Sequence, residues 1–196
     1  MRVELLTHTP EHLISDNAKV CYKNTSDKDI THSLVYNHKH LAVLRFAFAI
    51  ISVENVSVAC QNQMVRSKHL DFLVESKRYV SADKGEFSFI YPDTVTDTSS
   101  KAIFRMQWDN SIEMYKLLIE KGVKKEDARA VLPINTSTNL RAAGNLQAWM
   151  DFCKLRLNSH AQKEIRDVAS AVYDLLAEVY PQVFTAENKE ILKGEE

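Results

Sequence analysis

Apolar residues recur at intervals of three and four between positions 159 and 180, and this spacing predicts the clearest helix of the chain. Such intervals place the apolar side chains on one face, which we expect to pack against the core. Ser159, with Gln162 three positions later, matches the capping-box pattern, so the helix is predicted to begin at Ser159. The apolar face consists of Ile165, Val168, Ala169, Val172, Leu175, Leu176 and Val179.

Less regular patterns predict further helices. A helix over residues 10–20 would begin with Thr9 as its cap and Pro10 at its first position. A long helix over residues 100–122 would end at Gly122, because glycine commonly follows a helix end. Shorter helices are predicted over residues 38–44 and 53–65.

Three segments have the character of strands. Residues 45–51 form an apolar run rich in Phe and Ile, short enough for a buried strand. Residues 87–91 resemble an edge strand closed by Pro92, and residues 136–140 are a third candidate, followed by helices. The order of elements is therefore a mixed α/β one. A polar loop is expected over residues 23–31 and a turn-rich connection over residues 93–100.

The composition is that of one folded domain. The chain has 196 residues, of which 45% are hydrophobic, with only four Gly and four Pro; this suffices for one good core and is too short for two domains. The formal net charge of −1, with basic residues spread along the chain, argues against polymeric nucleic acid as a partner. No apolar run is long enough for a membrane span, and the amino terminus lacks the apolar core of a signal peptide. We therefore expect a cytoplasmic protein with no membrane partner.

The cysteines and histidines favour neither a disulfide nor a metal site. Cys21, Cys60 and Cys153 are odd in number and widely spaced, which suits reduced thiols, and Cys153 is expected in the core. His38 and His40 lie two positions apart without a carboxylate or thiol at ligand spacing. No metal is therefore predicted.

The most informative polar segment is a cationic cluster between Arg66 and Arg78. Arg66, Lys68 and Arg78, with hydroxyls at Ser67 and Ser76, surround a short run that suits an anion, and a phosphorylated ligand is the first candidate. The alternative for such a cluster taken alone is a solvated basic surface.

A second anion site is predicted where the helix over residues 159–180 begins. Arg156 and His160 flank the positive end of its dipole, a place that favours anions. The alternative is that Arg156 pairs with a carboxylate such as Asp151 and that His160 only packs or caps.

The order of these motifs resembles the flavin-dependent thymidylate synthase family. The family signature is Arg-His-Arg, seven residues, Ser, and then Arg-Tyr two positions on. Here Arg66-Ser67-Lys68 is followed after seven residues by Ser76 and then by Arg78-Tyr79. Two further stretches match in the same order and extend the resemblance over most of residues 3–184. They are His8-Thr9-Pro10 with Ala18-Lys19-Val20-Cys21-Tyr22, and Ala128-Arg129-Ala130-Val131-Leu132-Pro133 with Asn145, Leu155-Arg156, Ser159-His160-Ala161-Gln162 and Glu164-Ile165.

The resemblance implies a single compact α/β domain over residues 1–184, with a mainly antiparallel sheet flanked by helices. It also implies a homotetramer whose active sites form where subunits meet. The charged C-terminal tail over residues 185–196 is expected to be frayed and solvated.

The same resemblance implies an activity. Members of the family transfer a one-carbon unit from methylenetetrahydrofolate to carbon 5 of the uracil ring of dUMP, a pyrimidine deoxynucleoside monophosphate, while FAD reduced by NADPH supplies a hydride. Carried over residue by residue, the resemblance assigns the nucleotide to Gln63, Arg66, Ser76, Arg78, Arg129 and Arg156, with Ser76 and Arg156 taking part in catalysis. It assigns FAD to His40, Arg66, Ser67, Lys68, Asn145, Asp151, His160 and Cys21.

The chain departs from the family pattern on the flavin and folate side. Ser67 replaces the central His of the signature, and Lys68 replaces its second Arg, which keeps the charge but loses the planar fork of a guanidinium. Asp71, Leu73 and Val74 stand where Ser, Asn and Glu are usual, and Arg45 and Phe46 replace a common Glu-His pair. Three hypotheses stay open. They are a divergent thymidylate synthase, a relative that modifies another pyrimidine nucleotide or makes a 5-hydroxymethyl product, and a nucleotide-binding homologue without turnover.

Overall fold

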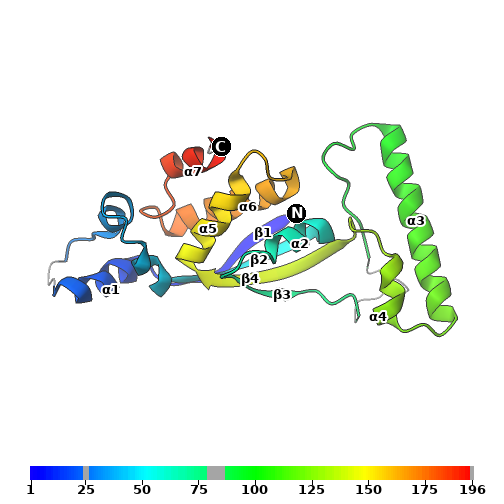
Figure 1. The fold of residues 1–196 in the computed structure, drawn as a ribbon, viewed down its shortest axis with the longest axis horizontal. Helices are drawn as coiled ribbons and strands as arrows, with labels where there is room; N and C mark the ends of the chain where they lie inside the picture. Colours follow the sequence, from blue (N-terminus) through cyan, green and yellow to red (C-terminus); the bar gives the residue numbers. More distant parts are fainter. Residues whose placement is uncertain (24–26, 79–86, 195–196) are drawn as a thin grey trace.

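A four-stranded antiparallel sheet forms the centre of the computed structural model, which describes residues 1–23, 27–78 and 87–194. The strands lie in the order β1-β2-β4-β3, and each neighbouring pair is antiparallel (Figure 1). With the helices that pack on it, this sheet confirms the predicted fold class. The strands are β1 (Arg2–His8), β2 (Phe48–Ser57), β3 (Asp71–Val74) and β4 (Ser137–Asn145).

Apolar side chains hold the two central strands against the core. Ala49, Ile51 and Val53 of β2 are buried, as are Leu140 and Ala142 of β4. Within each strand these residues recur at every second position, so their side chains share one face of the sheet. The main hydrophobic core packs against that face of the sheet.

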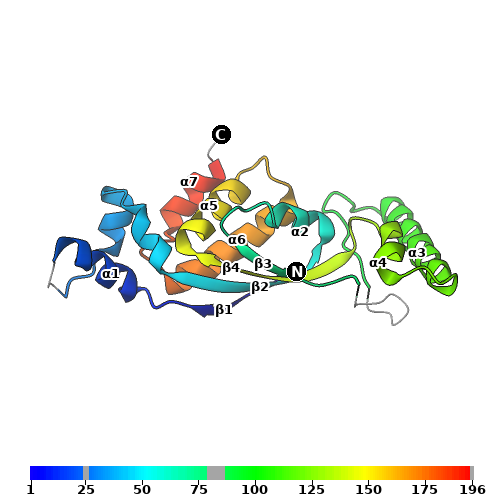
Figure 2. The same ribbon diagram turned by 60° about the horizontal axis from the view of Figure 1, so that its bottom comes forward.

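Helices cover this face of the sheet (Figure 2). The predicted apolar face of α6 is confirmed, because Ile165, Val168, Ala169, Val172 and Leu176 are buried and Leu175 and Val179 are half-buried. Trp149 of α5 is also buried, and its Nε1 donates to the carbonyl oxygen of Ala49 at 3.1 Å. Cys153 is buried as expected. The covering helices are α2 (Val58–Met64), α5 (Leu146–Leu157) and α6 (Lys163–Val179), and α7 (Ala186–Gly194) packs against α5.

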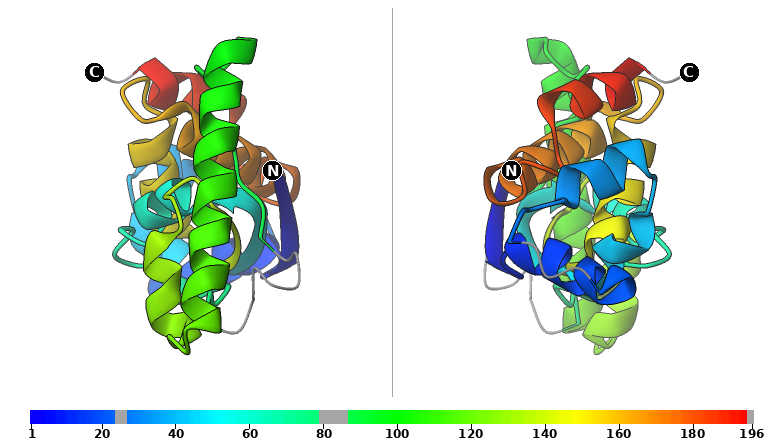
Figure 3. Two further views of the ribbon diagram at one scale, coloured as in Figure 1. Left: turned by 90° about the vertical axis from the view of Figure 1, so that its right-hand side faces the viewer. Right: turned by 90° about the vertical axis from the view of Figure 1, so that its left-hand side faces the viewer.

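The two ends of the elongated molecule are helical. α3 is the long helix at one end and stands apart from the sheet (Figure 1), and a small second core joins it to α4. Viewed along the long axis of the molecule, α3 lies across this end (Figure 3). The opposite end holds α1, a π-helical turn and a 3-10 helix (Figure 1). These elements are α1 (His12–Tyr22), the π-helical turn (Ser33–Asn37), the 3-10 helix (Leu41–Phe46), α3 (Thr98–Glu120) and α4 (Lys125–Ala128).

The predicted start of α6 is wrong. The helix begins at Lys163 instead of Ser159, and its first turn has no side-chain cap. Gln162 instead accepts a hydrogen bond from Nε2 of Gln63 at 2.6 Å. The residue expected to complete a capping box is therefore engaged by another helix.

The predicted long helix is confirmed as α3, which Asp97 caps by accepting from Ser100 N at 2.9 Å; Gly122 follows its end with a φ of 83°. The predicted cap of α1 is wrong, since that helix begins two residues after Pro10. The hydroxyl of Thr9 instead accepts from the backbone N–H of Phe48 at 3.0 Å and ties two chain segments together.

The region from residue 38 to residue 65 differs most from expectation. The predicted helix over residues 38–44 is a 3-10 helix that begins three residues later, and the predicted strand over residues 45–51 begins late and continues to Ser57. Residues 53–57 are therefore strand instead of helix, and only α2 remains of the predicted helix over residues 53–65. Pairing explains the difference, because Val53 and Val56 lie opposite Leu140 and Thr138 of β4.

Other segments differ in extent. Residues 87–91 contribute a single bridge, between Phe89 and Thr136, instead of an edge strand, and the strand predicted over residues 136–140 reaches Asn145. The expected frayed tail is wrong, because α7 forms there and buries Leu192. β1 was not predicted. Residues 24–26 of the predicted loop lie outside the described residues.

Two general properties can be stated for the part of the chain that the structure describes. None of its helices is both long enough and apolar enough to cross a membrane. Within the same ranges, no three His, Cys, Asp or Glu side chains lie close enough together to hold a metal ion.

Candidate functional site

Two of the predicted arginines, Arg66 and Arg156, line neighbouring cavities that share Asp151 and Leu155. Arg66 follows α2 and Arg156 lies in the last turn of α5. Burial lowers the pKa of Arg156, and the positive charge of Arg66 lowers it further. Because the two cations repel each other, an anion between them would be stabilised.

A hydrogen bond to α2 orients Arg156. Its Nη2 donates to the carbonyl oxygen of Gln63 at 2.6 Å, and this bond replaces the alternative pairing with Asp151, which accepts from Gln147 at 3.0 Å. Nε of Arg156 is buried without a hydrogen-bond partner among the described residues. A buried donor without a partner is suited to donate a hydrogen bond to a ligand oxygen.

Two neighbouring cavities surround this arginine pair. One, of about 310 Å³, is lined by Arg66, Ser67, Lys68 and Asp151. The other, of about 600 Å³, is lined by Asp151, Arg156 and His160. Ser67 Oγ is buried and has no partner within the described ranges. Six residues predicted for FAD or the nucleotide therefore meet here: Arg66, Ser67, Lys68, Asp151, Arg156 and His160. We call this region the Arg156 half-site.

The other two predicted arginines, Arg78 and Arg129, form a second pair through Glu126. Arg78 Nη2 lies 2.8 Å from the Glu126 carboxylate, and Arg129 Nε donates to the Glu126 carbonyl at 3.0 Å. The ion pair of Arg78 is solvent-exposed, so its contribution to stability is small and a phosphate can replace the carboxylate at little cost.

A third cavity, of about 530 Å³, lies beside this second pair. Ser76 and Arg129 line it, and Val58, Val74 and Leu132 supply apolar surface. Its size is within the range of small-molecule sites. We call this region the Ser76 half-site.

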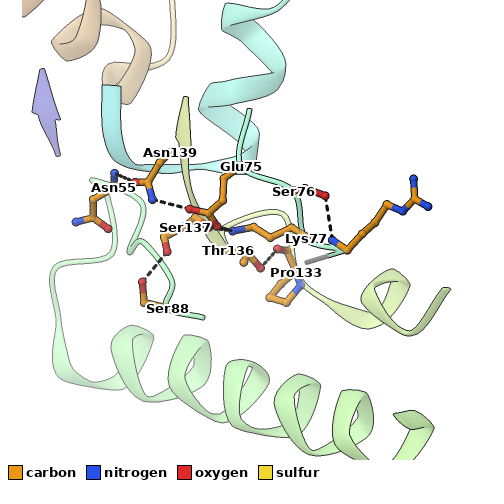
Figure 4. Close-up of polar contacts among 10 residues, drawn as sticks. Asn55, Glu75, Ser76, Lys77, Ser88, Pro133, Thr136, Ser137 and Asn139 are labelled. Atoms are coloured by element: carbon orange, nitrogen blue, oxygen red, sulfur yellow. Dashed lines mark hydrogen bonds and ion pairs between the residues drawn. The ribbon is translucent and has the colours of Figure 1, made fainter. Parts of the chain in front are cut away.

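Ser76 sits on the segment that follows β3, between two residues with well-defined contacts. Glu75 and Lys77 bind each other and the neighbouring strand β4, and the hydroxyl of Ser76 accepts from the backbone N–H of Arg78 at 3.3 Å (Figure 4). The serine predicted for catalysis is thus held from both sides. Tyr79, which completes the signature, lies outside the described residues.

Glu164 is a supporting residue whose structural role the sequence did not reveal. Its carboxylate accepts from Ser57 N at 2.7 Å and from Ser57 Oγ at 2.5 Å, while Ser57 Oγ caps α2 by accepting from Cys60 N at 3.0 Å. The pKa of Cys60 is raised to about 12, mainly by burial and also by the charge of Glu164, while the charge of Arg156 opposes the increase. Because it binds Ser57, the cap of α2, Glu164 fixes the start of the helix that carries Gln63. Its partner Ser57 is 107 positions away in sequence, so no local pattern could have identified it.

Three residues predicted for FAD lie elsewhere and line none of these cavities. Asn145 caps α5 by accepting from Ala148 N at 2.9 Å, which is a structural role. His40 directly precedes the 3-10 helix, and its N–H donates to the Leu34 carbonyl at 2.8 Å. Cys21 is exposed near the end of α1. Within one chain these residues do not join the two half-sites.

The two half-sites are also separate from each other. The cavity beside Ser76 shares no lining residue with the two cavities beside Arg156. A single chain therefore brings the four arginines together as two pairs and not as one cluster.

The structure thus combines an antiparallel α/β fold with cavities that arginine side chains line. The family model described as thymidylate synthase complementing protein (Thy1) matches residues 4–182. The flavin-dependent thymidylate synthase of Haloarcula marismortui is 30% identical, over 99% of this chain and 97% of that protein. The one of Geobacter sulfurreducens is 30% identical, over 94% of this chain and 85% of that protein. The chain belongs to the flavin-dependent thymidylate synthase family.

A solved structure confirms the fold. The crystal structure of Thymidylate Synthase X (ThyX) from Helicobacter pylori with FAD and dUMP superimposes with a TM-score of 0.77. It covers 94% of this chain and 97% of the Helicobacter chain at 19% sequence identity. The expected arrangement of antiparallel sheet and helices is that of a known member.

Proposed function

We propose that the protein is an FAD-dependent thymidylate synthase that transfers a one-carbon unit to carbon 5 of dUMP. Family membership supports the reaction class. The observation that carries the proposal for this chain is the pairing of its predicted arginines, Arg66 with Arg156 and Arg78 with Arg129. Guanidinium groups suit both the phosphate and the carbonyl oxygens of a pyrimidine nucleotide.

The residues of the Arg156 half-site fit FAD as the resident cofactor. Arg66 and Lys68 offer positive charge to a diphosphate, and the buried Ser67 Oγ, unpartnered among the described residues, offers a hydrogen bond. When bound, the flavin would supply the hydride, with NADPH as its reductant and methylenetetrahydrofolate as the carbon donor. Lys68 binds as a point charge, so this contact is weaker than the bidentate one available to arginine.

Each active site would use two copies of the chain. Arg156, Arg66 and Gln63 of one copy and Ser76, Arg78 and Arg129 of another would grip one nucleotide. This division follows from the separate half-sites and agrees with the homotetramer that the family resemblance implies.

α3 offers a surface for such an assembly. Ile103, Met106, Met114 and Leu117 are 62, 61, 47 and 49% exposed. At 100° per residue they lie within about 80° of one another around the helix. An exposed apolar stripe of this kind, although Asn110 interrupts it, suits burial against a second copy.

We also propose that the protein is cytoplasmic. Cys21, Cys60 and Cys153 are free thiols. Thiols that stay reduced suit a reducing compartment.

The test is direct analysis of product. The protein is incubated with FAD, NADPH, methylenetetrahydrofolate and dUMP, and the nucleotide is weighed by mass spectrometry. We expect thymidylate and a flavin absorbance band that bleaches with NADPH. A 5-hydroxymethyl product, or turnover of dCMP instead, would assign the protein to a related reaction. A colourless protein that binds dUMP but not FAD would show a nucleotide-binding homologue.

A further inference from the structure

The chain leaves the sheet immediately before Ser76. The β3–β4 ladder pairs Asp71 with Ala143 and continues to Val74 opposite Leu140, and one more rung follows, from Glu75 N to the Asn139 carbonyl at 2.9 Å. Continuing this register would place residue 77 opposite residue 137.

A side chain takes the place of the missing backbone rung. Nζ of Lys77 donates to the carbonyl oxygen of Ser137 at 2.7 Å (Figure 4). The chain is therefore still anchored to β4 two residues beyond Glu75, although its backbone has left the ladder.

The same ammonium group is held from two other directions. It forms an ion pair with the carboxylate of Glu75 and lies 5.2 Å from the centre of the Phe87 ring. Only 12% of the Lys77 side chain is exposed, and 21% of that of Glu75. Although Lys77 lines the cavity, these contacts occupy its charge, so it is poorly placed to bind a phosphate.

The carboxylate of Glu75 connects this pair to the centre of the sheet. Its second oxygen accepts from Asn139 Nδ2 at 2.5 Å, and Asn139 Oδ1 accepts from the backbone N–H of Asn55 at 2.9 Å (Figure 4). Asn55 lies where the register of β2 shifts and has a φ of 55°. The cluster of Glu75, Lys77, Asn139 and Asn55, which we call the Glu75 clamp, thus links β3, β4 and β2.

We propose that Glu75 and Lys77 are positioning residues that fix the hydroxyl of Ser76 in its cavity by anchoring both of its neighbours to β4. The inference rests on the proposed role of this cavity in nucleotide binding. The family resemblance implies a glutamate one position earlier, where Val74 stands in this chain. Successive side chains of an extended strand point to opposite sides, so a carboxylate at position 75 reaches partners that one at position 74 would not.

The test compares Lys77→Met with Lys77→Arg. We expect Lys77→Met to raise the dUMP dissociation constant and KM about tenfold, because it removes the anchor of Ser76 to β4 and leaves the Glu75 carboxylate without its ion pair. The value of kcat should change less than KM, and FAD affinity should stay as in the wild type. Lys77→Arg keeps a charged donor and should restore most of the dUMP affinity.

Lys189→Met is a matched control. Lys189 is also 12% exposed, and it binds the Asp174 carboxylate at 2.7 Å, the Ser170 carbonyl at 3.4 Å and the Tyr173 ring at 5.7 Å. These contacts join α6 to α7 and are not part of either half-site. Lys189→Met should therefore lower thermal stability to a similar extent without changing KM for dUMP.

A charge swap tests whether dUMP affinity depends on the geometry of the Glu75 clamp or only on its net charge. Glu75→Lys combined with Lys77→Glu preserves the total charge but places an ammonium against Asn139 Nδ2 and a carboxylate against the Ser137 carbonyl. We expect this double variant to stay impaired. Full recovery of dUMP affinity, or an unchanged KM in Lys77→Met, would overturn the proposal.

Amide hydrogen exchange in the absence of nucleotide keeps the test independent of the proposed function. Faster exchange at Arg78 N–H in Lys77→Met than in Lys77→Arg supports the clamp, and equal exchange overturns it. If the wild type shows the protected amide but does not bind dUMP, the clamp stands and the proposed function fails.

Discussion

Arg156 donates from Nη2 to the carbonyl oxygen of Gln63 at 2.6 Å, across 93 positions of sequence. The carbonyls in the last turn of a helix lack partners within it, so this guanidinium completes the end of α2. The same bond fixes the direction of the Arg156 charge and leaves its buried Nε for a ligand. Helix capping and the proposed nucleotide binding therefore depend on one side chain.

Arg156→Ala should lose both roles. We expect a loss of about 1 kcal/mol in the free energy of unfolding, from the hydrogen bond. We also expect a dUMP dissociation constant raised more than about tenfold, since a charge-assisted contact is lost. Urea unfolding and calorimetric titration measure the two effects. Arg166→Ala is the control, because Arg166 likewise donates to a backbone carbonyl, that of Ser159, but lines none of the described cavities.

Glu164→Ala should destabilise the protein through α2. It leaves the N–H and hydroxyl of the buried Ser57 without their acceptor, which costs about 1–3 kcal/mol. Glu164→Gln keeps one acceptor and should lose less. Glu178→Ala, at an exposed position of the same helix, should be nearly neutral in urea unfolding. Equal stability of the Glu164→Ala and Glu178→Ala variants would contradict the assignment.

Asp97 should make the stability of α3 sensitive to acid. Hydrogen bonds from Ser99 and Ser100 lower the pKa of Asp97 below its usual value of 3.8. A lowered folded-state pKa contributes stability above the unfolded value, and this contribution is lost as pH falls below 3.8 through the folded value. Asp97→Asn can still cap the helix but cannot titrate. Its thermal stability should therefore fall less steeply with acid than that of the wild type, and parallel curves would refute the role.

The apolar stripe of α3 should control assembly. Ile103→Glu and Met106→Glu place charges on the proposed contact and should reduce the mass of the complex in sedimentation. Lys101→Glu changes the charge on the opposite side of the helix and should leave the mass unchanged. An unchanged mass in all three variants would exclude this stripe from the contact.

The sequence predicted the elements whose patterns are clean. α6 has an apolar repeat of three and four on one face, and α3 has a recognisable stop at Gly122, so both were identified. β2 was misread in part because Ile51, Ser52 and Val53 are all buried, which removes the alternation expected of a strand. β1 is a half-exposed edge strand with little apolar signal.

The candidate site was predictable only as a set of residues. Motif spacing singled out Arg66, Arg78, Arg129 and Arg156, and the structure places them as two pairs. The contacts that hold the surrounding elements in place join residues far apart in sequence, and local sequence patterns do not reveal such contacts. Glu164 binds Ser57, and Lys77 binds Ser137, 60 positions away.

Mixing two inactive variants tests the central claim most directly. Arg156→Ala damages one half-site and Arg129→Ala the other, so each variant alone should lack thymidylate synthesis. If one site takes its halves from two copies, co-expression of both variants should restore up to about one quarter of the wild-type sites by random pairing. Activity that stays at the level of the single variants in a mixed assembly of wild-type mass would contradict the account.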